Sequence, residues 1–226
     1  MSVSDLSPST QNYLKAVWSI AEWSTEPVTP TLIAERTGLR VSSVSDGVKR
    51  MAGQGLVEHA PYGAVTLTDR GRALALAMVR RHRLIETFLV RTLGYSWDQV
   101  HDEAENLEHA VSDFLVDRID ELLEFPTRDP HGDPIPTSDG TIDLPDATQL
   151  TLLGTDVDVV VERISDGDPE LLQFFQEHGI VLGARLHVGP GAAYSGSLTV
   201  TVSDAAEPLA LGRLASDALY ASVLSS

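Results

Sequence analysis

The side chains in this sequence that are best suited to chemistry are six imidazole and carboxylate groups gathered in one short stretch: His82, Glu86, His101, Glu105, Glu108 and His109. Residues three and four positions apart share one face of a helix, so Glu105, Glu108 and His109 converge if their segment is helical. By the same rule, His82 stands one turn before Glu86. Two such helices lying side by side predict a metal site built from nitrogen and oxygen donors.

The donor types narrow the choice of metal because the chain contains no cysteine. Imidazole and carboxylate without thiolate suit Mn²⁺, Fe²⁺, Co²⁺ or Zn²⁺, and the large share of oxygen donors favours Mn²⁺. The alternative is a solvated helix face that carries ordinary charges. Salt bridges on such a face need nearby Lys or Arg, and residues 98–117 contain neither, which favours the metal site.

The composition is that of a folded protein with two or three domains, because the 226 residues are 42% hydrophobic with a mean hydropathy of −0.02. No apolar run approaches the roughly 18 to 20 residues of a membrane span. The N-terminal sequence MSVSDLSPST lacks a basic segment followed by an apolar one. We therefore expect no membrane partner and no secretion, and the absence of cysteine fits a cytoplasmic protein.

The net charge of −17 is distributed unevenly along the chain. Residues 1–92 carry eleven basic and eight acidic side chains, a net charge of +3, whereas residues 93–226 carry five and twenty-five, a net charge of −20. A mildly basic N-terminal part can approach the phosphates of double-stranded DNA. The acidic remainder attracts divalent cations.

The N-terminal part has the pattern of a winged helix-turn-helix. Apolar residues at helical spacing predict three helices, over residues 8–24, 31–38 and 42–55. Thr29 is the expected N-cap of the second helix, and Gly38 ends it. The alternating segment 56–71, with its Pro-Tyr-Gly turn, predicts a two-stranded wing. Since the third helix of this fold enters the major groove, we predict DNA contacts from Arg40, Ser42, Ser43, Asp46, Lys49 and Arg50.

The next segment is almost continuously helical in pattern. Residues 72–94 predict one amphipathic helix, and residues 97–123 predict a second. Their apolar stripes are broader than a single hairpin can bury. We therefore expect this hairpin to pack against a second copy of itself and form a homodimer.

The remaining sequence consists of a proline-rich segment followed by several short segments with an alternating apolar pattern. Residues 125–147 hold five prolines among turn residues, which predicts a linker or an extended strap. Short alternating segments then predict a small SH3-like barrel, with a helix over residues 168–179 inserted after its first hairpin. The expected fold class is mainly α with small β elements. We expect a winged helix-turn-helix at residues 1–71, a helical metal-binding and dimerisation domain at 72–147 and an SH3-like β-barrel at 148–226.

Three segments resemble those of the diphtheria toxin repressor and manganese transport regulator family: MVRRHRLIETFLV at 78–90, VHDEAENLEHAVSD at 100–113 and DPHGDPIP at 129–136. The resemblance extends over most of the chain, including the SH3-like (FeoA-like) tail, and the HDEAxxxEHxxSD pattern is long and specific. It implies a metal-sensing transcriptional repressor. Such a protein binds operator DNA as a metal-activated dimer and turns off metal-uptake genes.

The resemblance also assigns the candidate ligands to two sites. It implies an ancillary site of His82, Glu86 and His101, and a primary, activating site of Glu105, Glu108 and His109. Iron-sensing members carry Cys where this chain has Glu105. Replacing a soft thiolate by a hard carboxylate favours Mn²⁺, so the sequence is similar to the manganese-responsive branch. An Fe²⁺-responsive regulator of the same family is the alternative.

Three further residues take their expected roles from the resemblance. Asn12 aligns with a ligand that the family draws from its first helix, and its amide oxygen can coordinate a metal. Lys15 stands where some manganese regulators have a bridging Glu, so we expect two separate sites rather than a close pair of ions. Asp168 lies near the place from which longer members send an acidic ligand back to the ancillary metal, and the alternative is that it caps the helix that follows.

The expected mechanism follows from the position of Asn12 on the first helix. We hypothesise that metal ties this helix to the dimerisation hairpin and holds the two recognition helices at the spacing of successive major grooves. Two other classes stay open. A metal-dependent hydrolase would use the same donors, but neither HExxH nor HxxEH is present. A regulator sensing a small molecule would leave the acidic side chains solvated. We expect no enzymatic activity and no small-molecule substrate.

Overall fold

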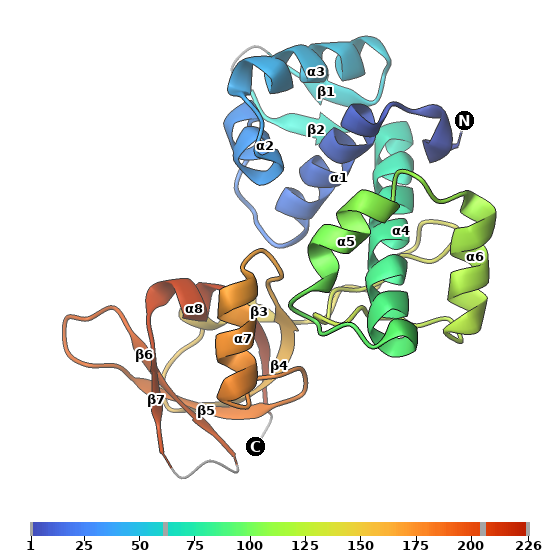
Figure 1. The fold of residues 1–226 in the computed structure, drawn as a ribbon. Coiled ribbons are helices and arrows are strands. Elements are labelled where there is room, and N and C mark those ends of the chain that lie inside the picture. The colour runs from blue at the N-terminus through green and yellow to red at the C-terminus, as the bar shows by residue number, and fades with distance from the viewer. Residues whose placement is uncertain (1, 61–62, 204–206, 225–226) are drawn as a thin grey trace. The chain divides into compact units, whose positions relative to one another are not determined.

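The computed structural model describes residues 2–60, 63–203 and 207–224, and Figure 1 labels its helices and strands. The chain forms two compact units. Unit 1 contains residues 1–85, 105–125 and 135–142, and unit 2 contains residues 86–104, 126–134 and 143–226. The long helix α4 (Asp69–Leu93) and the short helix α5 (Val100–Leu107) contribute to both. The domain borders expected after residues 71 and 147 stay predictions.

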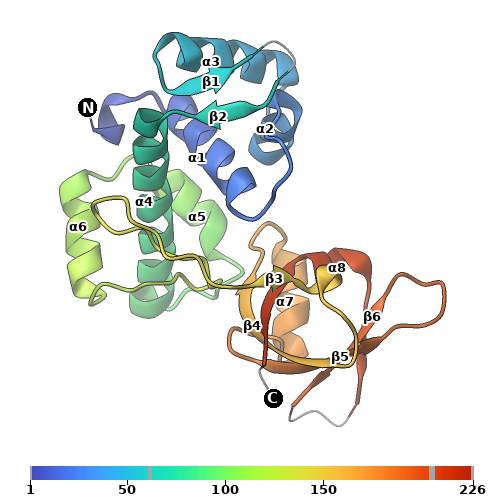
Figure 2. The same ribbon diagram turned by 180° about the vertical axis from the view of Figure 1, so that it is seen from behind.

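Unit 1 begins with the winged helix-turn-helix that the sequence predicts. Its elements are η1 (Val3–Asp5), α1 (Pro8–Glu22), α2 (Pro30–Thr37), α3 (Val41–Gly53) and the antiparallel strands β1 (Val57–His59) and β2 (Val65–Leu67), seen from behind in Figure 2. The side chains of Ser7 and Thr29 cap α1 and α2, and Gly38 ends α2 in the left-handed region, with φ of 66°. Residues 61 and 62 of the predicted turn lie outside the described residues.

The core of the winged helix-turn-helix lies between its three helices. Leu14, Ile33 and Val44, one from each helix, are fully buried there. A Cβ atom at Gly47 would lie 2.3 Å from the ring of Tyr13, so α3 approaches α1 this closely because that position has no side chain. This packing leaves the polar side chains of α3 on the outer surface of the unit.

The helix predicted over residues 97–123 is wrong as one continuous element, because the structure divides it into α5 (Val100–Leu107) and α6 (Asp113–Leu122). The Ser112 side chain accepts a hydrogen bond from the backbone N–H of Leu115 and starts α6 as its N-cap. The carbonyl oxygen of Glu108 accepts a hydrogen bond of 3.0 Å from the buried guanidinium of Arg81. Glu108 and His109 therefore lie in a turn rather than on a helix face.

The Pro-rich segment is buried in its middle, at residues 129 and 131–136, although its composition predicts a linker or strap. In unit 2, the backbone N–H of Ile164 donates to the carbonyl oxygen of His131 at 2.9 Å. The Arg128 guanidinium donates to the Glu162 carbonyl at 3.0 Å. Gly132 has a φ of 91°, and a Cβ there would lie 2.2 Å from the Glu162 oxygen. The segment thus runs in close contact with strand β4 (Val157–Ile164).

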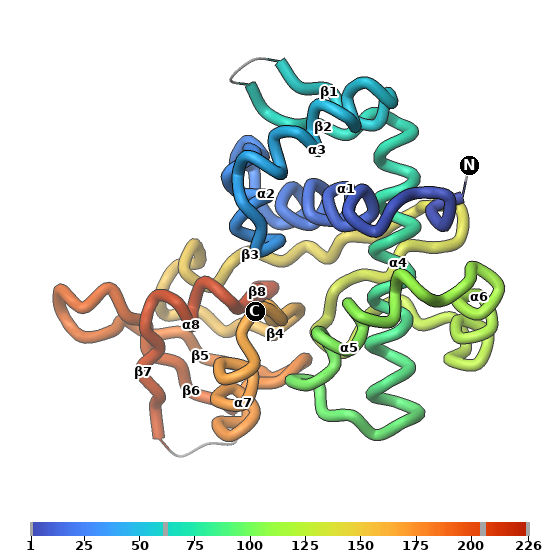
Figure 3. Tube along the Cα trace, turned by 45° about the horizontal axis from the view of Figure 1, so that its top comes forward, coloured from blue at the N-terminus to red at the C-terminus, as the bar shows by residue number. Residues whose placement is uncertain are grey.

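The rest of unit 2 is a six-stranded antiparallel sheet with two helices, visible in Figure 3. Its other elements are β3 (Thr148–Gln149), η2 (Leu150–Leu152), α7 (Pro169–Glu177), β5 (Arg185–Pro190), β6 (Leu198–Val202), β7 (Leu209–Leu211), α8 (Arg213–Asp217) and β8 (Leu219–Val223). The strand order is β3-β8-β4-β5-β6-β7. Because β3 pairs with β8, the predicted first hairpin does not form, and α7 connects β4 to β5.

The predicted fold class is confirmed, since helices dominate the chain and small sheets form the wing and the SH3-like tail. The tail has its own core, in which Val159, Phe175 and Leu186 are buried. Among the described helices, none combines the length and the apolar character needed to cross a bilayer.

Candidate metal centres

Two carboxylates and one ammonium group meet inside unit 1. Lys15 Nζ, on α1, lies 2.6 Å from Glu105 Oε1 on α5. The same nitrogen lies 2.7 Å and 2.8 Å from the two carboxylate oxygens of Glu108 in the following turn. The side chain of Glu108 is fully buried and that of Lys15 is 12% exposed. We call Asn12, Glu105, Glu108 and His109 the primary group.

The ring of His109 is oriented by Gln11. Its Nδ1 lies 2.6 Å from Gln11 Oε1, while Gln11 Nε2 donates to the carbonyl oxygens of Val3 and Leu6 at 2.8 Å and 3.1 Å. Those two donations fix the amide orientation, so Oε1 must accept and the His109 hydrogen must sit on Nδ1. The lone pair on His109 Nε2, 3.7 Å from Glu108 Oε1, is thereby left for a metal.

Asn12 supplies an independent test of whether the primary group fits a metal ion. Its side-chain oxygen Oδ1 is buried and accepts no hydrogen bond from the part of the chain that the structure describes. A buried acceptor without a partner costs about 1 to 3 kcal/mol. Asn12 stands one turn before Lys15 on α1, so both face the same side. Amide, carboxylate and imidazole donors together fit a divalent cation such as Mn²⁺.

The pKa of Glu108 is lowered despite its burial. Burial alone would raise the pKa of this carboxyl, but the hydrogen bond and charge of His82 and the ammonium of Lys15 lower it below its ordinary value of 4.5. The carboxylate is therefore ionised at neutral pH, as a metal ligand must be.

His82 also contacts the primary group, and its assignment to the ancillary site stays a prediction. Its Nδ1 lies 2.6 Å from Glu108 Oε2. One ligand atom each from His82, Glu105 and Glu108 lie within 4.8 Å of one another. His82 thus stays a candidate ligand, with an outer-shell role at the primary group as well.

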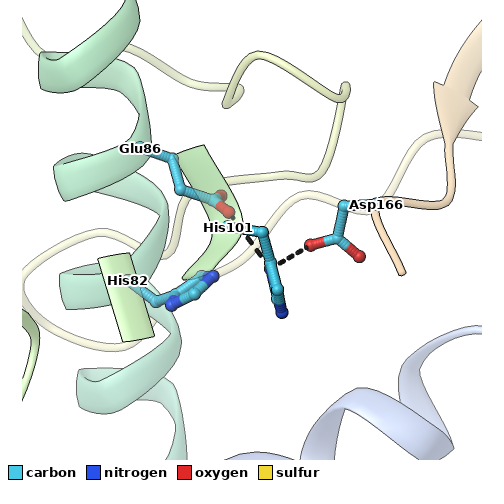
Figure 4. A group of neighbouring side chains, drawn as sticks. All are labelled: His82, Glu86, His101 and Asp166. Atoms are coloured by element: carbon cyan, nitrogen blue, oxygen red, sulfur yellow. Dashed lines mark ion pairs between the residues drawn. The ribbon is translucent and has the colours of Figure 1, made fainter. Parts of the chain in front are cut away.

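A second cluster lies within unit 2, and Figure 4 shows its central contacts. His101 Nδ1, on α5, lies 2.9 Å from Asp166 Oδ2 in the loop after β4 and 3.4 Å from Glu86 Oε1 on α4. The three residues each offer a ligand atom within 4.8 Å of the others. His82 stands one turn before Glu86 on the same helix. Burial alone would lower the pKa of His101, but hydrogen bonds and charges of Asp166 and Glu86 raise it to about 10.

The Pro-rich segment brings two more donors to this cluster, Asp129 and His131, which sequence reasoning missed. They form a fully buried group with Glu86, again with ligand atoms within 4.8 Å of one another. Asp129 Oδ1 accepts from the backbone N–H groups of His131 and Asp133 at 2.8 Å and 2.9 Å. The sequence signal for these two donors was an Asp and a His separated by a single proline in the family-like segment DPHGDPIP. We call Glu86, His101, Asp129, His131 and Asp166 the ancillary group.

Only one of the two nitrogens of the His131 ring has a hydrogen-bond partner among the described residues. Its Nε2 lies 2.7 Å from the Trp97 carbonyl oxygen, and the two rings stack. Its Nδ1 is buried, makes no hydrogen bond to the described residues and lies 3.9 Å from Glu86 Oε2. Burial would lower the pKa of His131, but the charges of Glu86, Asp129 and Asp166 raise it. The carboxylates around a buried imidazole fit a divalent cation.

Asp168 takes a different place from the one expected. Its exposed carboxylate accepts hydrogen bonds from the backbone N–H groups of Glu170 and Leu171 at 3.0 Å and 3.1 Å, which caps α7. Asp166, two residues earlier, is the side chain that contacts His101. We therefore assign the acidic donor of the tail to Asp166 and give Asp168 a capping role.

The side chains predicted to contact DNA all lie on the exposed side of α3 or at its start: Arg40, Ser42, Ser43, Asp46, Lys49 and Arg50. Asp46 and Lys49 form an exposed pair at 3.8 Å, one turn apart. Such a pair contributes little to stability and is easily exchanged for contacts to phosphates. Their DNA contacts stay predictions.

Comparisons with known proteins match three successive parts of the chain to family models. Residues 5–65 match the model of the iron dependent repressor N-terminal DNA binding domain. Residues 68–137 match the iron dependent repressor metal binding and dimerisation domain, and residues 148–222 match the FeoA domain.

Individual proteins are also similar to this chain over most of its length. The iron-dependent repressor IdeR of Mycobacterium tuberculosis (strain ATCC 25618 / H37Rv) is 36% identical over 203 residues, covering 82% of this chain and 86% of that protein. A solved manganese-dependent transcriptional repressor complex with manganese has a TM-score of 0.91 at 50% identity, covering 95% of this chain and all of that chain. The manganese regulator SloR has a TM-score of 0.81 at 30% identity, with coverages of 97% and 100%.

The chain therefore belongs to the iron-dependent repressor family, that of the diphtheria toxin repressor. It is a metal-dependent transcriptional repressor, and repressors of this family bind DNA and dimerise through the metal-binding domain. The hydrolase alternative is wrong, because this is a family of regulators rather than enzymes.

Proposed function

We propose that this repressor is activated by Mn²⁺ and turns off metal-uptake genes in the cytoplasm. The observation that carries the proposal is the carboxylate of Glu105 in the primary group, in a chain that has no cysteine. Hard carboxylate and amide oxygens favour Mn²⁺ over softer ions of the same charge. The similar structure at 50% identity, named as a manganese complex, supports the same metal.

The primary group links two parts of unit 1 because its donors come from different helices. Asn12 lies on α1, which packs against the DNA-reading helix α3, while Glu105, Glu108 and His109 lie on α5 and the following turn. A divalent ion bound by both would add a cross-link between them. Gln11 keeps His109 oriented, and Glu108 presents an ionised carboxylate. Coupling of this kind is worth about 1 to 3 kcal/mol per site.

We propose that DNA is bound by a homodimer. The helix α6 and its end expose large apolar side chains, Phe114 at 72%, Leu122 at 62% and Phe125 at 66%. Such side chains on one helix are typical of a face that another molecule covers. The six polar side chains of α3 then supply phosphate and base contacts in each half of a two-fold operator.

The metal is tested by titrating metal-stripped protein with Mn²⁺, Fe²⁺, Co²⁺ and Zn²⁺ under anaerobic conditions while recording calorimetric heats. In parallel, a random duplex library is selected for binding at each metal concentration. We expect Mn²⁺ to bind and to recover a palindromic sequence, with loss of binding on chelation. Recovery of the same sequence at equal affinity in chelator would contradict the proposal.

The alternative is an Fe²⁺-responsive repressor, and the iron-dependent relatives at 36% identity are the observation that favours it. The substitution Glu105→Cys separates the two metals. If carboxylate selects Mn²⁺, this variant shifts the order of affinities toward Fe²⁺ and Co²⁺. A preference of the wild type for Fe²⁺ supports the iron-responsive alternative. An order of affinities that the substitution leaves unchanged counts against Glu105 as a ligand.

A further inference from the structure

The ammonium of Lys15 occupies the middle of the primary group's carboxylates. Its three contacts to Glu105 and Glu108, at 2.6 to 2.8 Å, are short charge-assisted hydrogen bonds. A fourth polar atom, His82 Nδ1, lies 3.4 Å away. Lys15 thus contacts the same oxygen atoms that are candidate metal ligands.

Other basic side chains of unit 1 near this group are directed at other carboxylates. Arg81 pairs with Asp113, at the start of α6, and Arg83 pairs with Glu22 at 2.6 Å. Lys15, together with His82 beside Glu108, therefore supplies positive charge to the partly exposed Glu105 and the buried Glu108. Glu108, which is fully buried, depends most strongly on such a partner because an uncompensated buried charge is costly.

We propose that Lys15 is a tethered competitor of the metal, a cation of the chain itself that must leave the carboxylates before a divalent ion binds them. The inference rests on the proposed function, because it assumes that the primary group binds the activating metal. Lys15 then lowers the affinity of the group and raises the metal concentration at which the repressor responds.

The same contacts give Lys15 a structural role without metal. Lys15 is on α1 and its partners are on α5 and the next turn, so the ammonium already links the helices that a bound ion would link. Metal binding is then an exchange of one cation for another. Removing the Lys15 charge should weaken the metal-free fold and strengthen metal binding, and these opposite signs distinguish competition from simple packing.

The first experiment compares wild type, Lys15→Met and Lys49→Met. Lys49→Met is the matched control, since it removes the same charge from an exposed site on α3. Mn²⁺ affinity is measured by competition with a fluorescent chelator, and the melting temperature is measured in excess chelator. We expect Lys15→Met to bind Mn²⁺ about ten-fold more tightly or better and to melt at a lower temperature without metal. Lys49→Met should match the wild type in both.

A second measurement needs no variant and applies if Lys15→Met does not fold without metal. The chain has two lysines, Lys15 and Lys49, so acetylation of each is resolved by peptide mass spectrometry. We expect Mn²⁺ to raise the labelling rate of Lys15 several-fold, because the ammonium leaves its carboxylates, and to leave that of Lys49 unchanged.

The outcomes separate the two proposals. Tight Mn²⁺ binding by the wild type, with equal or weaker affinity in Lys15→Met, overturns the role of Lys15 and leaves the proposed function intact. Saturation of the wild type with Mn²⁺ without faster Lys15 labelling also overturns it. If the wild type and Lys15→Met both fail to bind Mn²⁺, it is the proposed function that fails.

Discussion

The primary and ancillary groups are both clusters of buried acids, but they are neutralised in different ways. In the primary group, the positive charge includes the ammonium of Lys15, together with His82 beside Glu108. In the ancillary group, it comes from the imidazoles of His101 and His131, whose pKa values are both raised by the surrounding carboxylates. An ammonium must move away to admit a metal ion, whereas a protonated imidazole must lose its proton.

Two clusters of similar composition can therefore respond to different variables, one to competition with a side-chain cation and the other to pH. Metal binding at the primary group requires the ammonium of Lys15 to leave its carboxylates. Binding at the ancillary group competes with protons and is therefore sensitive to pH. We expect the two groups to be separable by substitution and by pH.

The largest effect is expected from Glu108→Gln, which removes the fully buried carboxylate that contacts both Lys15 and His82. Metal affinity of the primary group should fall by more than the roughly 10 to 100-fold that loss of an outer-shell partner costs. Operator binding should be lost with it. Calorimetry checks this, with Glu121→Gln on the exposed side of α6 as the control. Retained high-affinity binding at full stoichiometry would show that Glu108 is not a ligand.

A smaller effect on metal binding is expected from substituting Asp166, and none from substituting Asp168. Asp166→Asn should weaken metal binding at the ancillary group and leave the primary group intact, because Asp166 contacts His101. Asp168→Ala should leave both affinities unchanged and cost about 0.5 to 2 kcal/mol of stability by removing the α7 cap. Calorimetric titration and chemical denaturation measure the two effects. The assignment is refuted if Asp168→Ala lowers the metal stoichiometry.

The smallest expected effect is a pH dependence of stability in metal-stripped protein. The pKa of His101 is raised in the folded state from 6.5 to about 10, so its ion pairs stabilise the fold fully below pH 6.5. This contribution declines as pH rises from 6.5 and is lost above about 10. Melting temperatures of wild type and His101→Gln, measured in chelator from pH 6 upward, should therefore converge as pH rises. Parallel curves would contradict the charge assigned to His101.

Several elements of the fold were predictable because their signals are local. The caps Thr29 and Gly38 and the periodicity of α1 to α4 depend on residues a few positions apart, and the structure confirms them. The break between α5 and α6 was missed because apolar periodicity continues across it, although Ser112 offered a local N-cap signal; Arg81, far away in the chain, also binds the Glu108 carbonyl there. Helical periodicity alone contains no information about such a partner.

At the candidate site, too, contacts between residues far apart in the sequence were missed. Residues 98–117 contain no Lys or Arg, which favoured a metal site over salt bridges, but Lys15 reaches Glu105 and Glu108 from another helix. His131 lies in a segment whose prolines predict a linker or an extended strap, yet residues 131–136 are buried.

The sequence by itself determined the types of donor, the absence of thiolate, the regular elements and the likeness to metal-dependent repressors, since all of these depend on residue identity and short spacing. Only the tertiary structure decided which cation faces which carboxylate. It placed Asp166 rather than Asp168 beside His101, brought Asp129 and His131 to Glu86, and set Lys15 among the primary carboxylates. The physical reason is that ion pairs and metal ligands act over a few ångströms in space, whatever the number of residues between them.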